Sequence, residues 1–330
     1  MAGASTPAMA AAAANAGALG SLGVALASIE KIHAEASAAR AATNGALNLN
    51  FFCHKAPAFD AAKTEAMKGR LRGYYDAYGL GEPADPTASP PFDEDRLEAV
   101  LAIGPRVASF HFGLPEARLL KPLKDAGIAI LSSATSPKEA IRLEREGADA
   151  VIAQGWEAGG HRGVFDPDAD PGDMGTFALV PAIVDRVSIP VIAAGGVADG
   201  RGVAAALMLG AAGVQIGSAL LNSPESMIGA PHKAALLASD GSDTATTRAF
   251  SGRPARGVRN RYMTEMASEE TLDFPLMNPL TGPLRAASSK AGSGEFMSMW
   301  AGQAIGLNRT ETTGETIERI VAEAAALLDG

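Results

Sequence analysis

Along residues 1–220, segments with the apolar spacing of a helix alternate with segments that have the apolar spacing of a strand. An apolar residue every three to four positions predicts a helix, whereas short apolar or strictly alternating runs predict strands. The run 46–52 is of the second kind, because Asn48 and Asn50 alternate with apolar residues. The predicted helices are 7–16, 28–43, 60–79, 115–126, 137–146, 176–186 and 200–209, and the predicted strands are 18–22, 46–52, 106–112, 128–132, 149–154, 190–194 and 213–217.

This regular alternation is typical of the α/β class, because parallel neighbouring strands need crossover helices between them. A length of 330 residues fits a (β/α)8 TIM-type barrel of roughly 250 residues with additional segments. The pattern gives seven strands, and the first predicted helix follows Met1-Ala2-Gly3 directly. We therefore expect a barrel that lacks its first strand, and an open doubly wound sheet is the alternative.

The alternation ends near residue 223, which suggests how the chain is organised. Residues 1–223 are expected to form the barrel. Residues 224–310 are rich in Ser, Thr, Arg, Pro and Asn, and they resemble an appended cap more than another repeat. A last helical pattern at 315–328 predicts that residues 311–330 pack back on the barrel.

Charge and composition narrow the possible partners. Asp and Glu number 37 against 28 Lys and Arg, so the formal net charge of −9 disfavours nucleic acid. Residues 1–29 carry no charge, but they lack a basic flank and contain Pro7 and several glycines, so we expect no membrane role. A single cysteine, Cys53, allows neither an intramolecular disulfide nor a cysteine-based metal site, which favours an ordinary buried thiol in a reducing cytoplasm.

Glycine is the compositional outlier, and three glycine-bearing segments follow predicted strands. The chain has 37 glycines, against roughly 23 at an average usage of about 7%. In the first segment, Gly159 and Gly160 precede His161 after the strand that ends at Gln154. An imidazole on such a loop can titrate near neutrality and transfer a proton. The alternative is that His161 only hydrogen-bonds its own loop.

The second and third segments follow the last two predicted strands. Gly195 and Gly196 come after one strand, and Gly217 and Ser218 come after the next. Barrel enzymes bind phosphate at this position, where backbone N–H groups face the anion. The alternative is that each glycine pair only forms a tight turn.

The other histidines are weaker candidates for the site. His33 and His232 fall on helical patterns, so we expect them at the surface. His111 ends a predicted strand and is a second-rank candidate. Asn48 and Asn50 share one face of their strand, so both amides can point toward one ligand or neighbouring backbone.

Several of these segments together resemble the nitronate monooxygenase, or 2-nitropropane dioxygenase, family. The resemblance rests on Asn50-Phe-Phe, the loop 154–163, Ala193-Ala-Gly-Gly196 and Gln215-Ile-Gly-Ser218, with Trp300-Ala-Gly-Gln303 later in the chain. It implies FMN as the cofactor and His161 as the catalytic residue. The residues that the resemblance assigns to FMN are Asn50, Gln154, Gly159, Gly196, Gln215, Ile216, Gly217 and Ser218.

The resemblance also implies a reaction, the oxidation of alkyl nitronates, and of nitroalkanes, with O2 to a carbonyl compound and nitrite. His161 would act either as a general base toward a nitroalkane or as a cation or donor that orients a nitronate, and we favour the second role. The expected partners are a small nitronate and O2, with homo-oligomers left open. The rival functions are an FMN- and NAD(P)H-dependent enoyl or quinone reductase of the same fold and a flavin-free phosphate-binding protein.

Overall fold

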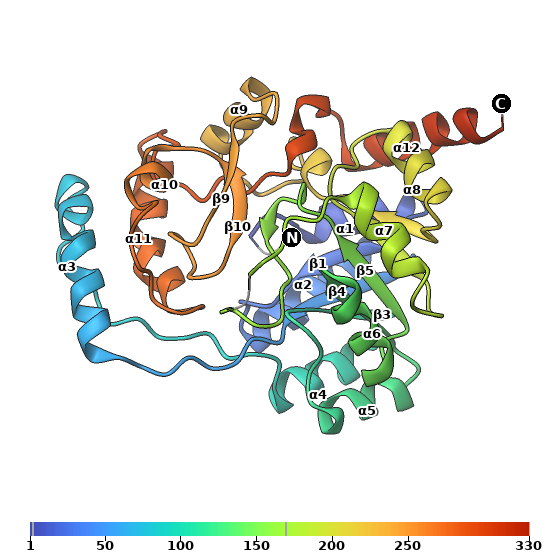
Figure 1. Ribbon diagram of the computed structural model, residues 1–330, viewed down its shortest axis with the longest axis horizontal. Helices are drawn as coiled ribbons and strands as arrows, with labels where there is room; N and C mark the ends of the chain where they lie inside the picture. The colour runs from blue at the N-terminus through green and yellow to red at the C-terminus, as the bar shows by residue number, and fades with distance from the viewer. Residues whose placement is uncertain (2, 169, 330) are drawn as a thin grey trace.

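The computed structural model describes residues 1, 3–168 and 170–329, and a parallel sheet lies at its centre (Figure 1). Its strands are β1 (Gly20–Gly23), β2 (Leu47–Phe52), β3 (Val107–His111), β4 (Ala129–Ala134), β5 (Ala150–Gln154), β7 (Val191–Ala194) and β8 (Gly213–Gln215). Within the described residues these seven strands are paired in the order β1-β2-β3-β4-β5-β7-β8. The α/β barrel architecture and the predicted strands are therefore confirmed.

The sheet is open on one side. β1 and β8 are its edge strands and do not pair with each other in the part of the chain that the structure describes. This agrees with the expectation of a barrel without its first strand. One result of the opening is that Gln215, at the end of β8, is exposed to solvent.

Helices cover the outer face of the sheet. They are α1 (Pro7–Asn15), α2 (Ile29–Ala42), α4 (Glu94–Ile103), α5 (Ala117–Asp125), α6 (Pro137–Glu146), α7 (Thr176–Val184) and α8 (Gly200–Met208). The last helix, α12 (Thr313–Leu328), packs on α8 and α1, and Thr312 with Glu315 forms a capping box at its start. Among the described residues, no helix is long and apolar enough to cross a membrane.

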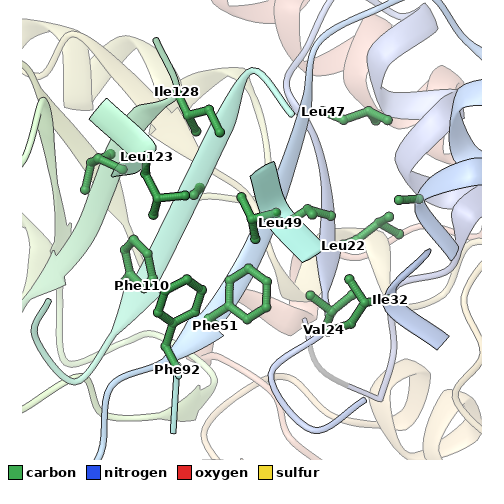
Figure 2. Packing of buried hydrophobic residues seen from close by; sticks show 14 of the residues in the cluster. Leu22, Val24, Ile32, Leu47, Leu49, Phe51, Phe92, Phe110, Leu123 and Ile128 are labelled. Carbon is green, nitrogen blue, oxygen red and sulfur yellow. The ribbon is translucent and has the colours of Figure 1, made fainter. Parts of the chain in front are cut away.

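The core lies between the sheet and these helices, as the alternation along β2 predicts. Leu47, Leu49 and Phe51 are at most 2% exposed and pack in the cluster shown in Figure 2. The intervening Asn48 and Asn50 point to the opposite face, which is the interior of the barrel. One face of the strand therefore stabilises the fold, and the other faces the interior.

The structure corrects the pattern analysis between β2 and β3. The predicted helix 60–79 exists as α3 (Ala61–Ala77), but it is not a barrel helix. Its Met67, Leu71 and Tyr75 pack on residues of the 224–310 segment, and Figure 1 shows α3 standing away from the barrel. The barrel helix here is α4, which the pattern analysis missed although Asp93 caps its start. α4 has 10 residues against 17 in α3, so the longer helical pattern was taken for the barrel helix.

Residues 224–310, here named the cap segment, contain α9 (Ala230–Ala238), β9 (Thr244–Thr247), β10 (Ala255–Val258), α10 (Arg261–Glu265) and α11 (Met277–Lys290). β10 pairs in antiparallel fashion with β9 and also with β6 (Gly160–His161). The glycine-rich loop after β5 is therefore hydrogen-bonded to the cap segment. This pairing positions the first candidate residue of the site.

Candidate active site

His161 lies where the barrel meets the cap segment. It follows β5 at the carboxyl edge of the sheet and pairs with Ala255 of β10. Gly159 must be glycine here, because an added Cβ would lie 2.5 Å from the backbone of Ala301 and Gly302. Gly160 has a φ of 71°, which side chains other than glycine rarely adopt. The glycines therefore allow the close approach that holds His161 between the two parts.

The backbone of His161 is held by two side chains of the barrel. Its carbonyl accepts hydrogen bonds from His111 Nε2 at 3.0 Å and from Gln154 Nε2 at 2.9 Å. Because a carbonyl only accepts, neutral His111 carries its hydrogen on Nε2, and its Nδ1 accepts from Ser133 Oγ at 2.9 Å. His111 thus faces the candidate site, as its place at the end of a strand suggested. Its hydrogen bond to the His161 carbonyl helps to hold the loop that carries His161.

Aromatic rings surround the imidazole of His161. The ring centroids of Phe52, Phe112, Phe274 and Trp300 lie 5.5 to 6.1 Å from that of His161. Burial among these rings, followed by the positive charge near the site, lowers the pKa of His161 to about 3. The imidazole is therefore neutral at physiological pH, which argues against a cationic role.

Two arginines contribute to the positive potential at His161. Both Arg253 and Arg285 lower the pKa of the imidazole. Arg253 is 2% exposed, and its guanidinium stacks 4.0 Å from the ring centroid of Phe112 while Nη1 donates to the Val164 carbonyl at 2.7 Å. Burial lowers the pKa of Arg253 to about 10, so it remains charged near neutrality. The surroundings of His161 therefore favour an anion.

Sequence reasoning did not find the hydroxyl that contacts His161. Ser251 Oγ lies 2.8 Å from His161 Nε2, although the two residues are 90 positions apart in the chain. Ser251, Arg253 and Phe274 all come from the cap segment, in which no periodic pattern marked them. A Ser-Gly-Arg turn followed by a strand was the available signal, and it is weak by itself.

The carboxyl ends of β7 and β8 carry the two predicted glycine segments side by side, since Ala194 pairs with Gln215. Gly195 and Gly196 have φ angles of 105° and 74°. Among the described residues, the N–H groups of Gly195, Gly196, Gly217 and Ser218 donate no hydrogen bond. Four donors without partners at one edge fit a phosphate group. The start of α8 is less suited, because Asp199 already caps it.

The other predicted cofactor residues lie along the same edge or in the barrel interior. Asn48 and Asn50 Nδ2 both donate to Ser109 Oγ at 2.9 Å. Gln154 is used within its own loop, since its Oε1 accepts from the Gly163 N–H at 2.7 Å. Ser218 Oγ accepts from the Gly302 N–H at 2.8 Å. Ile216 is half-buried beside the exposed Gln215.

The expectation that His232 lies at the surface is wrong. It is 5% exposed, and its Nε2 lies 3.2 Å from the Trp300 carbonyl. The inner face of α9 packs on the chain near residue 300, which a helical pattern alone does not reveal. His33 is half-buried, and Cys53 is half-buried with a pKa that burial raises. In the part of the chain that the structure describes, no cluster of side chains could hold a metal ion.

Comparisons with known proteins identify relatives that match most of the chain. The family model described as nitronate monooxygenase matches residues 1–323. A nitronate monooxygenase of Paraburkholderia phytofirmans is 41% identical over 329 residues, which cover 98% of this chain and 90% of the relative. The solved nitroalkane oxidase of Streptomyces ansochromogenes is similar with a TM-score of 0.93 and 36% identity, covering 100% of this chain and 95% of that one. FabK from Thermotoga maritima is similar with a TM-score of 0.74 and 29% identity, covering 100% and 92%.

Proposed function

This chain belongs to the nitronate monooxygenase family, and on that premise we propose that it oxidises alkyl nitronates with O2 to a carbonyl compound and nitrite, with FMN as its cofactor. Family membership makes it an oxidoreductase that acts on nitronates or nitroalkanes. The observation that carries the proposal is the place of His161, a neutral imidazole in an aromatic enclosure at the carboxyl edge of the barrel.

The residues at this edge fit FMN. The unpartnered N–H groups of Gly195, Gly196, Gly217 and Ser218 would receive its phosphate. The proposed contacts to the cofactor are Asn50, Gln154, Gly159, Gly196, Gln215, Ile216, Gly217 and Ser218. When bound, the flavin would supply the electron-transfer chemistry that no side chain of this site can provide.

The side chains around His161 would bind and orient the substrate. Arg253 and Arg285 make the potential at His161 positive, which favours the anionic nitronate over a neutral competitor. Phe52, Phe274 and Trp300 surround the same position and would form apolar walls for the substrate. The neutral imidazole of His161 would then hydrogen-bond the nitro group or accept the α-proton of a nitroalkane.

One anaerobic experiment tests this function. The purified protein is mixed without oxygen with an alkyl nitronate in one sample and with NADH in another, and flavin absorbance is followed. We expect the nitronate to bleach the flavin and NADH to leave it oxidised. The likeness to FabK supports a second candidate, a reductase that uses a reduced nicotinamide, and this candidate predicts the opposite pair of results. A colourless preparation that binds no added FMN would contradict both.

We also propose an organisation that serves this function. Residues 1–223 would bind FMN, the cap segment 224–310 would close over the substrate, and 311–330 would form a helix against the barrel. α3 is an exception within the first range, because its buried residues pack on the cap segment. Residues 2, 169 and 330 of these ranges lie outside the described part of the chain.

A further inference from the structure

We infer that Ser251 fixes the tautomer of His161, so that Nε2 carries the ring hydrogen and Nδ1 is the nitrogen presented to the substrate. Ser251 is thus a positioning residue that acts through the imidazole. The inference rests on the proposed function, because it concerns the substrate that His161 would meet. It selects one of the roles that the sequence left open, a base at Nδ1 of a neutral ring.

The contacts of Ser251 allow two arrangements of hydrogens. Its Oγ lies 2.8 Å from His161 Nε2 and 3.3 Å from the carbonyl oxygen of Arg253, and it accepts a hydrogen bond from the Arg253 N–H at 3.4 Å. A hydroxyl has one hydrogen to donate. Ser251 therefore donates either to His161, which would leave the hydrogen of the imidazole on Nδ1, or to the Arg253 carbonyl, which would leave it on Nε2.

Burial decides between the two arrangements. Ser251 and Arg253 are each 2% exposed, and Ser251 Oγ is the only donor that reaches the Arg253 carbonyl among the residues described. A buried carbonyl without a partner is costly, whereas Nδ1 of the half-buried His161 can face a ligand or water. The favoured chain of hydrogen bonds therefore runs from His161 Nε2–H to Ser251 Oγ, and from Ser251 O–H to the Arg253 carbonyl.

The turn that carries Ser251 is held in place on both sides. Gly252 has a φ of 89°, and an added Cβ would lie 2.3 Å from the Leu272 carbonyl oxygen. The Gly252 N–H donates to the Arg248 carbonyl at 2.8 Å. Arg253 Nη1 reaches across to the Val164 carbonyl, two residues beyond the loop's Arg162. Ser251 is therefore placed before any ligand arrives, as a positioning residue requires.

The chemical consequence is a proton transfer with a defined acceptor. With the hydrogen on Nε2, the lone pair of Nδ1 can take the α-proton of a nitroalkane. The C–H bond breaks, the proton moves to Nδ1, and the electron pair of that bond is delocalised into the nitro group to give the nitronate. Burial by itself disfavours a positive ring, and the negative charge of the nitronate formed beside Nδ1 would compensate it, while Nε2–H donates to Ser251 Oγ.

The tautomer can be measured directly by nitrogen NMR of the full chain labelled with 15N-histidine. We expect His161 of the purified protein to show a protonated Nε2 and an unprotonated Nδ1. Ser251→Ala should convert this pattern to a mixture, whereas Ser251→Thr, which keeps the hydroxyl, should preserve it. Ser133→Ala is the matched control, because Ser133 contacts His111, which reaches only the backbone of His161, so the His161 tautomer should be unchanged. A protonated Nδ1 in the unsubstituted protein would overturn the inference, whether or not the alanine variant folds.

Kinetics supply the second readout. Ser251→Ala should lower kcat/KM for a neutral nitroalkane about tenfold, the loss expected for one buried hydrogen bond, and affect a pre-formed nitronate less. Ser251→Thr should recover most of the nitroalkane rate. Equal losses with both substrates, or an alanine variant with an unchanged tautomer, would reject the role of Ser251. If the unsubstituted protein oxidises neither substrate, the proposed function fails, while the NMR result still stands by itself.

Discussion

The neutral ring of His161 sets a specific pH dependence for the reaction. Burial and the nearby arginines lower its pKa to about 3, from 6.5. We therefore expect kcat/KM for a pre-formed nitronate to show no inflection from His161 between about pH 5 and 8. Initial rates at constant ionic strength would check this, with binding of the same nitronate measured in parallel. An inflection near pH 6.5 that disappears in His161→Asn would show instead that the ring titrates at its ordinary pKa.

Gly196 tests the proposed phosphate position. Its φ of 74° is strained for any other residue, so valine at this position would cost about 1–2 kcal/mol in conformational energy. Gly196→Val should therefore change the turn and direct its N–H away from the ligand. We expect purified Gly196→Val to contain little flavin by absorbance. Gly213→Ala is the matched control, since it lies on β8 with open space around its Cβ position and a φ outside the strained range. Retention of full flavin content by Gly196→Val would exclude this position.

The sequence indicated part of this candidate site and could not indicate the rest. Gly159, His161 and Gly196 lie in loops that follow parallel strands, and the carboxyl ends of such strands lie at one edge, so their proximity follows from the pattern. Ser251, Arg253 and Phe274 reach the same place from the cap segment. Their contacts depend on how that segment folds back over about 90 residues, and local periodicity contains no information about such a contact.

At the scale of elements, α3 and α4 also show that a local pattern does not predict what a helix packs against. Both helices lie between β2 and β3, and the pattern analysis took the longer one as the barrel helix. Which helix covers the sheet depends on which apolar surface is complementary to the strands, and α3 instead matches the surface of α11 and Phe250. Capping residues such as Asp93 mark where α4 begins, but they do not say what it packs against.

Leu71 tests whether α3 is held by the cap segment. It is fully buried between α3 and that segment, so Leu71→Ala should lower the free energy of unfolding by about 2–5 kcal/mol. Urea denaturation would measure the change, and limited proteolysis should cut first in the connections around α3. Leu101→Ala on α4 is the control. Leu101 is 38% exposed, so this substitution should lower the free energy of unfolding much less. Equal effects of the two substitutions would show that α3 is not held in this way.

At the scale of the whole molecule, two buried and two half-buried histidines make the stability depend on pH. Burial lowers the pKa of His54, His111 and His232 to about 4 and that of His161 to about 3. As the pH falls below the ordinary value of 6.5, the unfolded chain therefore takes up protons before the folded chain does. The stability is complete above that value and decreases toward pH 4, by up to about 1.4 kcal/mol per pH unit for each histidine.

Urea denaturation at neutral and mildly acidic pH would measure this loss. We expect the unfolding free energy of His232→Gln to depend less on pH, by about one proton, because the substitution removes one of the four titrating groups. An unfolding free energy that is constant down to about pH 5 would show that the histidines already bind protons in the folded chain.

The short pairing of β6 with β10 also restricts how a substrate can enter. Ala255 pairs in register with His161, so the cap segment cannot swing outward as a rigid lid without pulling the histidine with it. A hinged opening would dismantle the site each time a molecule entered. We therefore expect a substrate to enter through small local movements of side chains such as Phe274 and Trp300, and these movements would limit the size of the molecule that the site accepts.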